Sequence, residues 1–256
     1  MTDTPYPDSS PHHDTFHRAR NYPYDRAAHS FVFDRGEILP LPTETEELIA
    51  GCHPVLAFGS NAAPEQLRRK YADHDEVRFV VTRATLKDYD VVYSAHLTSY
   101  GAVPATLAPS VGTVLETWIT WLDDDQLSHM HQTEMGAGGG ADVNYAYGHL
   151  QGLSLDTEGV ENPLTSVGVY LSNFGALALA DAPLAFTRIA AANRQFEECE
   201  KTVVLEAVRQ QLAPDHSADE FILAITTDPA RRAAWGDELK ALAHTFEFPD
   251  FVHLVP

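Results

Sequence analysis

The sequence predicts an α+β protein. Apolar runs rich in β-branched and aromatic residues, which favour strands, are mixed along the chain with amphipathic stretches that favour helices. The two kinds of segment do not alternate strictly, as they do in a parallel α/β sheet. The chain has 256 residues, of which 44% are hydrophobic, so it can bury a sizeable core without disulfides or a structural metal.

Residues 1–52 are predicted to be a partly irregular N-terminal extension. The stretch 1–35 mixes Pro, Asp, His, Arg and Tyr without periodicity, which favours a coil or an arm packed on the body of the protein. One short helical turn is expected over 44–50. His13 and His17 are interpreted as solvated residues of this extension.

A core is predicted over residues 53–150. The apolar run 54–58 favours a buried strand, and the Pro-Glu pair that follows the turn 59–61 suits the start of a helix over 64–71. Further strands are expected over 77–83, 90–95, 113–122 and 145–150, with a helix over 123–135 and a glycine-rich loop over 136–141.

Residues 151–256 are predicted to add strands and C-terminal helices that pack on the core. Strands are expected over 167–172 and 177–180, and helices over 194–212, 217–225 and 229–243. Ser217 and Asp228 precede the last two helices. Their side-chain oxygens suit the capping of the first N–H groups of those helices.

The charge balance excludes several classes of partner. Acidic residues outnumber basic ones by 37 to 17, giving a formal net charge of −20. Such a field repels the phosphates of nucleic acids and the surface of anionic membranes. No apolar stretch reaches the ~20 residues that a membrane-spanning helix needs. No signal peptide is apparent at the N-terminus, so a cytoplasmic protein is expected.

The cysteine and histidine pattern indicates no metal site. Cys52 and Cys199 are the only cysteines, which is too few for a disulfide framework or a zinc-cysteine site. The acids of 123–125 are expected at a helix start because they complement its macrodipole. His129 and His131 are two residues apart, so a helix points them to different faces.

The turn of Phe58, Gly59, Ser60 and Asn61 is the first candidate site. Glycine allows a positive φ and a close approach of a ligand to the main chain. The N–H groups at the start of the following helix favour a carboxylate or a phosphate. The alternative is an ordinary turn in which Ser60 or Asn61 is a local cap.

Glu134 is the second candidate. It lies four residues after Met130 and seven after Leu127, a spacing that places it on the apolar face of the predicted helix. A lone carboxylate there is expected to be desolvated, which raises its pKa and suits it to general acid–base catalysis. His131, on a nearby face, is a candidate to hydrogen-bond it. The alternative is that Glu134 ends the helix and points to solvent.

Taken together, these features resemble the gamma-glutamylcyclotransferase-like superfamily. Phe58-Gly59-Ser60-Asn61 resembles its YGSN signature, and the segments 84–89 and 105–110 are similar to its A-x-L-x-x-Y and A-T-hydrophobic-x-P-S segments. The strand over 114–122 and the helix that ends at Glu134 are similar to the unit that carries the family's catalytic glutamate. The resemblance covers about residues 54–150.

The resemblance implies a small mixed β-barrel with flanking helices, here extended by C-terminal helices. It also implies that the main chain of Gly59, Ser60 and Asn61 holds the glutamyl end of a small-molecule substrate. Glu134 would be the acid/base, with no cofactor and no metal. Phe58 and Tyr145 are expected to line the pocket, and Tyr147 is a further candidate.

The implied reaction is intramolecular. The α-amine of a gamma-glutamyl amide or peptide attacks the γ-carbonyl and releases 5-oxoproline. The chain departs from the family pattern at Phe58, where the family has tyrosine, and at His131 and Met135, where it often has Asp and Gly.

Two alternatives to an enzyme remain open at this point. One is a non-catalytic module of the same fold that binds small carboxylates or regulates another protein. The other is an accessory protein whose C-terminal helices bind a partner. The segments 1–52 and 151–256 are expected to cover the barrel, close the site or form a homo-oligomer interface.

Overall fold

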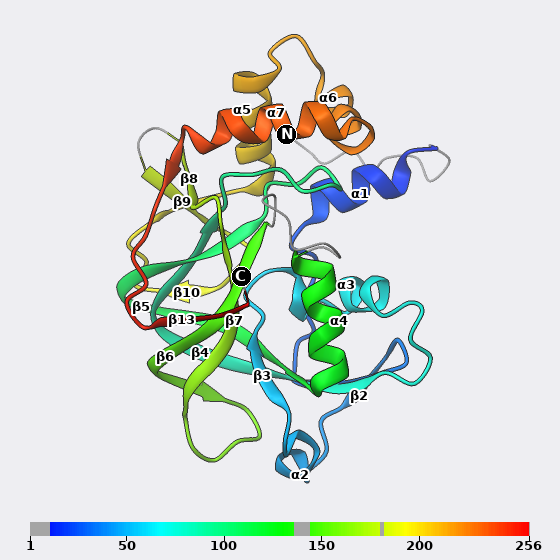
Figure 1. Ribbon diagram of the computed structural model, residues 1–256, viewed down its shortest axis with the longest axis vertical. Coiled ribbons are helices and arrows are strands. Elements are labelled where there is room, and N and C mark those ends of the chain that lie inside the picture. The colour runs from blue at the N-terminus through cyan, green and yellow to red at the C-terminus, as the bar shows by residue number, and fades with distance from the viewer. Residues whose placement is uncertain (1–10, 136–143, 180–181, 256) are drawn as a thin grey trace.

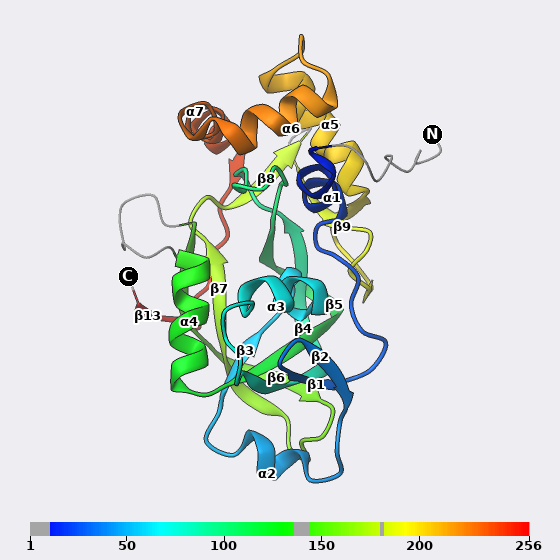
Figure 2. The same ribbon diagram turned by 90° about the vertical axis from the view of Figure 1, so that its right-hand side faces the viewer.

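Five strands close into a barrel in the computed structural model, which describes residues 11–135, 144–179 and 182–255. They are β3 (His53–Leu56), β4 (Arg78–Tyr93), β5 (Ala105–Leu122), β6 (Tyr145–Thr157) and β7 (Leu164–Ser172). Around the ring the order is β5, β3, β7, β6, β4 and back to β5. The β3–β7 pair is parallel and the others are antiparallel. The barrel is therefore mixed (Figures 1 and 2).

β4 and β5 are longer than the sequence predicts. They pair from Val80 opposite Trp121 to Tyr93 opposite Ala105, with one irregularity between Lys87 and Tyr89. Asp88 at this bulge has a φ of +67°, and its carboxylate accepts the N–H of Gly112 at 2.7 Å. A bulge bends a strand without ending it. The two strands predicted over 77–83 and 90–95 are therefore one.

The extension has more regular structure than predicted. It contains α1 (His13–Asn21), β1 (Phe31–Asp34), β2 (Glu37–Pro40) and α2 (Thr45–Ile49). Strand β1 pairs with β2 and with β4, so the extension adds to the barrel sheet. Of the two alternatives for 1–35, the described part fits an arm packed on the body of the protein and not a coil. The sequence does not predict α1 and β1 because they are short, and tertiary packing decides segments of this length.

Small strands and helices follow the barrel. They are β8 (Ala176–Leu179), β9 (Ala182–Phe186), β10 (Ala191–Ala192), β11 (Glu197–Cys199), α5 (Lys201–Leu212), α6 (Ala218–Thr227), α7 (Pro229–Lys240), β12 (Ala243–His244) and β13 (Phe251–Val255). The three helices gather at one end of the barrel, beside α1 (Figure 1). Ring strand β7 and part of β6 lie beyond residue 150, where the predicted core ends.

The predicted helix over 194–212 is wrong at its start. It begins only at Lys201, because residues 197–199 form β11, which pairs in parallel with β9. Phe196 packs against Phe246, with ring centroids 5.8 Å apart, instead of joining the apolar face of the helix. The last predicted helix likewise ends at Lys240.

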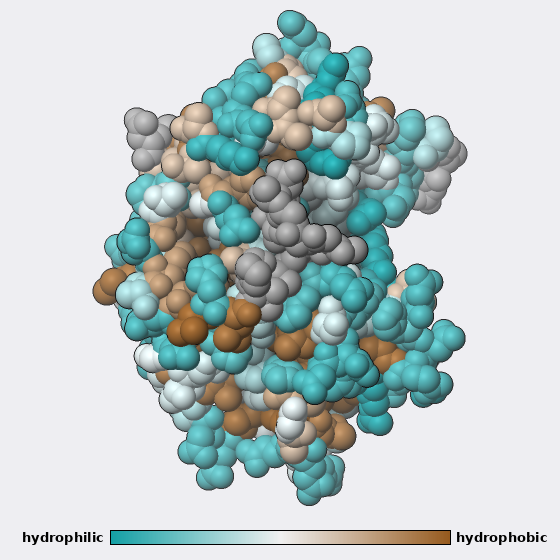
Figure 3. Space-filling view, in the orientation of Figure 1, coloured by the Kyte–Doolittle hydropathy of each residue, from teal (hydrophilic) through white to brown (hydrophobic). Residues whose placement is uncertain are grey.

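The buried apolar residues form one large cluster and several smaller ones. The large cluster joins barrel residues such as Leu86 and Ile119 to Val208 of α5 and Trp235 of α7. A second cluster packs α3 (Pro64–Lys70) and α4 (Asp124–Met135) on the barrel through Leu67, Met130 and Trp118. Polar side chains cover much of the face in Figure 3. Within the described ranges, no helix is long and apolar enough to span a membrane.

Candidate active site

The turn predicted from the sequence lies between β3 and α3. It leads into a short 3-10 helix over Ser60–Ala62. Gly59 does not use the positive φ that glycine allows, since its φ is −92°. Glycine suits this position because there is too little space for a side chain. A Cβ at Gly59 would lie 2.9 Å from the hydroxyl oxygen of Tyr22, which is closer than side chains tolerate.

The N-terminal extension supports this turn. Tyr22 accepts the N–H of Ala105 on its hydroxyl at 2.9 Å. The guanidinium of Arg26 donates to the carbonyl of Phe58 and, at 3.2 Å, to that of Gly59. Burial lowers the pKa of Arg26 to about 10. Residues of the predicted extension thus hold the main chain of the turn in place.

Glu134 faces the turn. Asn61 donates from Nδ2 to Oε1 of Glu134 at 3.2 Å, although the two residues are 73 positions apart. The Glu134 side chain is 16% exposed. The carboxylate therefore does not point to solvent, as it would in the alternative interpretation.

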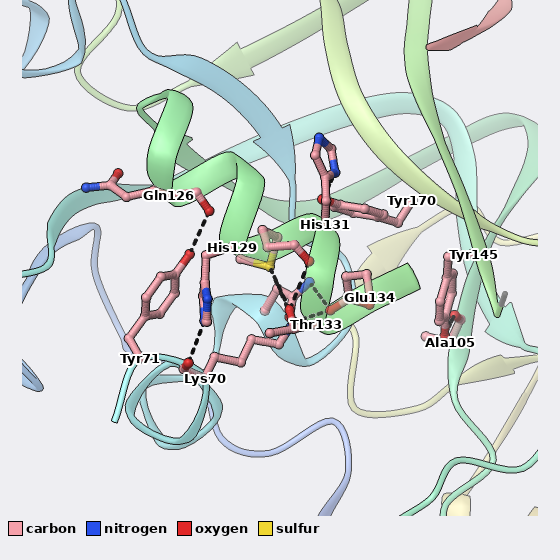
Figure 4. A network of polar contacts seen from close by, with 12 residues as sticks. Lys70, Tyr71, Ala105, Gln126, His129, His131, Thr133, Glu134, Tyr145 and Tyr170 are labelled. Carbon is pink, nitrogen blue, oxygen red and sulfur yellow. Dashed lines mark hydrogen bonds and ion pairs between the residues drawn. The ribbon is translucent and has the colours of Figure 1, made fainter. Parts of the chain in front are cut away.

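Lys70 gives Glu134 a partner that the sequence does not predict. Its ammonium group forms an ion pair with Oε1 of Glu134 and donates to Oγ1 of Thr133 at 3.0 Å. The Lys70 side chain is only 7% exposed. Figure 4 shows the three side chains converging at the end of α4. The expectation of a lone carboxylate is thus wrong, because α3 brings a cation to it.

His131 does not contact Glu134. Its Nδ1 lies 2.8 Å from the hydroxyl of Tyr170, and its ring packs edge-on against Tyr147. Burial lowers the pKa of His131. His129 instead bonds the carbonyl of Lys70 at 2.7 Å (Figure 4). The two histidines thus face different ways, as their spacing predicts.

A pocket of about 140 Å³ lies between the turn and the end of α4. It is lined by all six predicted site residues, Phe58, Gly59, Ser60, Asn61, Glu134 and Tyr145. Tyr145 donates to the carbonyl of Ala105 at 3.2 Å, and burial raises its pKa well above the usual value. Tyr147 lies in the second apolar cluster instead of this pocket. The predicted loop over 136–141 lies outside the described residues, as does the side chain of Met135.

Several residues that line the pocket were not predicted from the sequence. They are Tyr22, Gln66, Lys70, His96, Thr98, Ser99 and Tyr100. Only Lys70 carries a local signal, since it ends the helix that follows the turn. Gln66 lies on the same helix, α3. The others come from the extension and from the loop between β4 and β5, and only the closed barrel brings them to the turn.

Three pocket residues hold buried polar atoms that no described residue satisfies. These atoms are Oδ1 of Asn61, Oε1 of Gln66 and Nε2 of His96. The Asn61 amide must direct its nitrogen to Glu134, because a carboxylate only accepts hydrogen bonds. Its oxygen is therefore free to accept from a ligand. Buried polar atoms without a protein partner indicate a site for a ligand or water.

Among the described residues that line the pocket, one is a cation and one is an anion. These are Lys70 and Glu134, because burial lowers the pKa of His96 to about 3 and keeps its imidazole neutral near pH 7. Among the described residues, no group of three or more His, Cys, Asp or Glu side chains is placed to hold a metal ion. The arrangement suits a ligand that itself carries both charges.

The solved structures that are similar to this chain include the two described here. No family model matches the chain, and no curated protein matches it. The solution structure of At5g39720.1 from Arabidopsis thaliana is 14% identical with a TM-score of 0.35, covering 65% of this chain and 95% of that one. A gamma-glutamyl cyclotransferase is 13% identical with a TM-score of 0.35, covering 77% and 90%. The family that the sequence resembles is thus represented among these structures.

Proposed function

We propose that this chain releases 5-oxoproline from a gamma-glutamyl amide or peptide, with Glu134 as the general acid/base. The observation that carries the proposal is the hydrogen bond between Asn61 and Glu134. It joins the turn and the carboxylate, the two features picked out independently in the sequence, in one pocket that a small molecule can enter.

The charges of the pocket suit the head of a gamma-glutamyl group, which carries an α-ammonium and an α-carboxylate. The ammonium would donate to Glu134 and to the free oxygens of Asn61 and Gln66. The contacts that described residues make with Glu134 reach Oε1, so Oε2 is left for the ligand. The carboxylate would take Lys70 as its partner, together with the N–H groups that begin the turn of 3-10 helix.

The reaction moves two protons from one nitrogen to another. Glu134 takes a proton from the α-ammonium, and the freed amine attacks the γ-carbonyl carbon. A carbon–nitrogen bond forms and closes the five-membered ring, and the bond to the leaving nitrogen breaks. Glu134 returns each proton to that nitrogen, so it ends as a carboxylate. Because amine and carbonyl belong to one molecule, holding the substrate folded supplies much of the rate.

The first test is 5-oxoproline release from a panel of gamma-glutamyl dipeptides and gamma-glutamyl amines. We expect Glu134→Gln to lower kcat by about 10²- to 10⁴-fold, the usual contribution of a general acid/base. Glu65→Gln is the matched control, since Glu65 pairs with Arg69 on α3 and does not line the pocket. Equal loss in both variants, or full activity of folded Glu134→Gln, would contradict the role of Glu134.

The ion pair of Lys70 with Glu134 favours a second candidate, a non-catalytic module that binds small carboxylates. The ammonium group of Lys70 occupies Oε1, one of the two carboxylate oxygens with which Glu134 would contact a substrate. This candidate predicts no 5-oxoproline from any panel member. Calorimetry would then detect binding of glutamate-like ligands that persists in Glu134→Gln.

A further inference from the structure

A second cavity of about 360 Å³ lies against the first. The two share three lining residues, His96, Ser99 and Asn144. The far wall of the second cavity comes from α7, through residues that include Arg232, Asp237 and Lys240. Helix α7 lies outside the segment 54–150 that resembles the family, so this wall is a feature of the present chain.

His96 stands where the cavities meet. Its side chain is 3% exposed, and its ring packs against those of Phe174 and Tyr145, with centroids 4.7 and 5.6 Å away. Nδ1 lies 2.8 Å from Oγ of Ser94, and the same hydroxyl lies 2.6 Å from Oγ of Ser172 and 3.2 Å from the carbonyl oxygen of Gly175. Nδ1 therefore has a partner, whereas Nε2 is a buried polar atom that no described residue satisfies.

The wall from α7 brings positive charge to a strongly acidic protein. Lys240 pairs with Asp237 at 2.7 Å, so these two charges offset each other. Arg232 donates from Nη1 to the carbonyl of Ile225 at 2.7 Å, which uses one of its five N–H groups. No carboxylate of the described residues forms an ion pair with its guanidinium. An anionic group in this cavity would find Arg232 and, at its side, Lys240.

We propose that the second cavity binds the leaving group of the substrate and selects leaving groups that end in an anion. The scissile amide would form a hydrogen bond with Nε2 of His96, and the anionic end, a carboxylate or a phosphate, would face Arg232 and Lys240. Ring closure in the first pocket would then release the amine into the second. This inference rests on the proposed function and adds to it the residues that choose the leaving group.

The test uses matched pairs of gamma-glutamyl amides. One member of each pair carries an amine of the form H₂N–(CH₂)n–COO⁻, with one to four methylenes, and the other carries the alkylamine of equal length. A third series ends in a phosphonate and distinguishes the two anions. The wild type is expected to favour the anionic members in kcat/KM by about 10-fold at the length that reaches Arg232.

In Arg232→Met, the ratio of kcat/KM for the anionic member to that for the neutral member is expected to fall close to one. Arg231→Met is the matched control, because Arg231 lies next to it on α7, pairs with Asp228 and does not line the cavity. His96→Leu should lower kcat/KM for both members of each pair, since both carry the scissile amide. The proposal is overturned if the wild type has equal kcat/KM for the two members of every pair. It is also overturned if Arg232→Met keeps the preference of the wild type for the anionic members.

Failure of the proposed function has a different signature. If no amide yields 5-oxoproline, calorimetric binding of the same pairs to the wild type and to Arg232→Met takes the place of kinetics. Tighter binding of the anionic members that is lost in Arg232→Met supports the second cavity as an anion subsite. Equal binding of paired members, or no binding, overturns the subsite.

Discussion

The charges of Lys70 and Glu134 neutralise each other while the pocket holds no ligand. Both side chains are largely buried, so neither charge is well solvated by water. A gamma-glutamyl head group brings one charge of each sign. When this head group binds, Lys70 and Glu134 can separate, because each of them then contacts a group of opposite charge on the substrate. Under the proposed function, Lys70 would therefore bind the substrate as well as pair with Glu134.

This role predicts how Lys70 shapes specificity. A 4-aminobutanoyl amide closes to the same ring size but lacks the α-carboxylate. The wild type is expected to prefer the gamma-glutamyl amide by about 30-fold or more in kcat/KM, because an unpartnered buried charge costs about 2–5 kcal/mol. Lys70→Gln should remove most of this preference, whereas Lys87→Gln, an exposed change on β4, should keep it. An unchanged ratio in Lys70→Gln would rule the role out.

The candidate site could be predicted from the sequence as far as local pattern reaches. The apolar run before Gly59 and the spacing of Leu127, Met130 and Glu134 are properties of single segments. Lys70 could not be assigned to Glu134, because its position at the end of one helix does not say which neighbour packs there. Tyr22 and His96 were missed for the same reason, since distant contacts place them in the pocket.

At the scale of elements, α6 shows how local chemistry fixes a boundary. Ser217 accepts the N–H of Glu220 on its hydroxyl, and the Glu220 carboxylate accepts the N–H of Ser217. Both bonds satisfy donors that a helix start leaves open. The pattern is readable in the sequence, and Ser217 and Asp228 cap α6 and α7 as predicted.

Removing this cap has a measurable cost. Ser217→Ala is expected to lower the free energy of unfolding by about 1 kcal/mol, since it leaves the N–H of Glu220 without a partner. Ser217→Thr keeps a hydroxyl and should lose much less. Urea denaturation measures both. A Ser217→Ala protein as stable as the wild type would mean that water replaces the cap at no cost.

Elements without such signals were predicted less well. The sequence predicts a helix for β11 because the helical spacing of the apolar residues of α5 continues by chance to Phe196. The segment is a strand because it pairs with β9, which lies earlier in the chain. The sequence predicts two separate strands on either side of Asp88, because sequence alone does not distinguish a bulge within a strand from the end of a strand. Both errors occur where long-range pairing overrides local preference.

For the molecule as a whole, the barrel and the C-terminal helices share one apolar cluster. Leu56 and Phe58 of the site belong to the same cluster as Val204, Phe221 and Trp235. No described boundary separates a barrel core from a helical core. The structure therefore predicts that both parts unfold together.

Two probes check this prediction. In Trp235→Phe the remaining tryptophans, Trp118 and Trp121, lie in the barrel strand β5, so fluorescence reports on the barrel. Circular dichroism at 222 nm reports mainly on the helices. The two urea transitions are expected to coincide in midpoint and slope. Helices that melt while barrel fluorescence persists would show two independent units.

The contact of α1 with α6 has a consequence for how the protein is made. Phe16 and Ala19 are buried against Ile222, and Arg20 pairs with Asp219, which lies 199 residues further along the chain. At ribosomal rates of about 5–20 residues per second, α1 waits about 10–40 s before its partner is translated. During that interval the nascent chain exposes the side chains of Phe16 and Ala19, which the folded protein buries. Until α6 has been translated, a chaperone can bind these side chains, or they can make incorrect contacts.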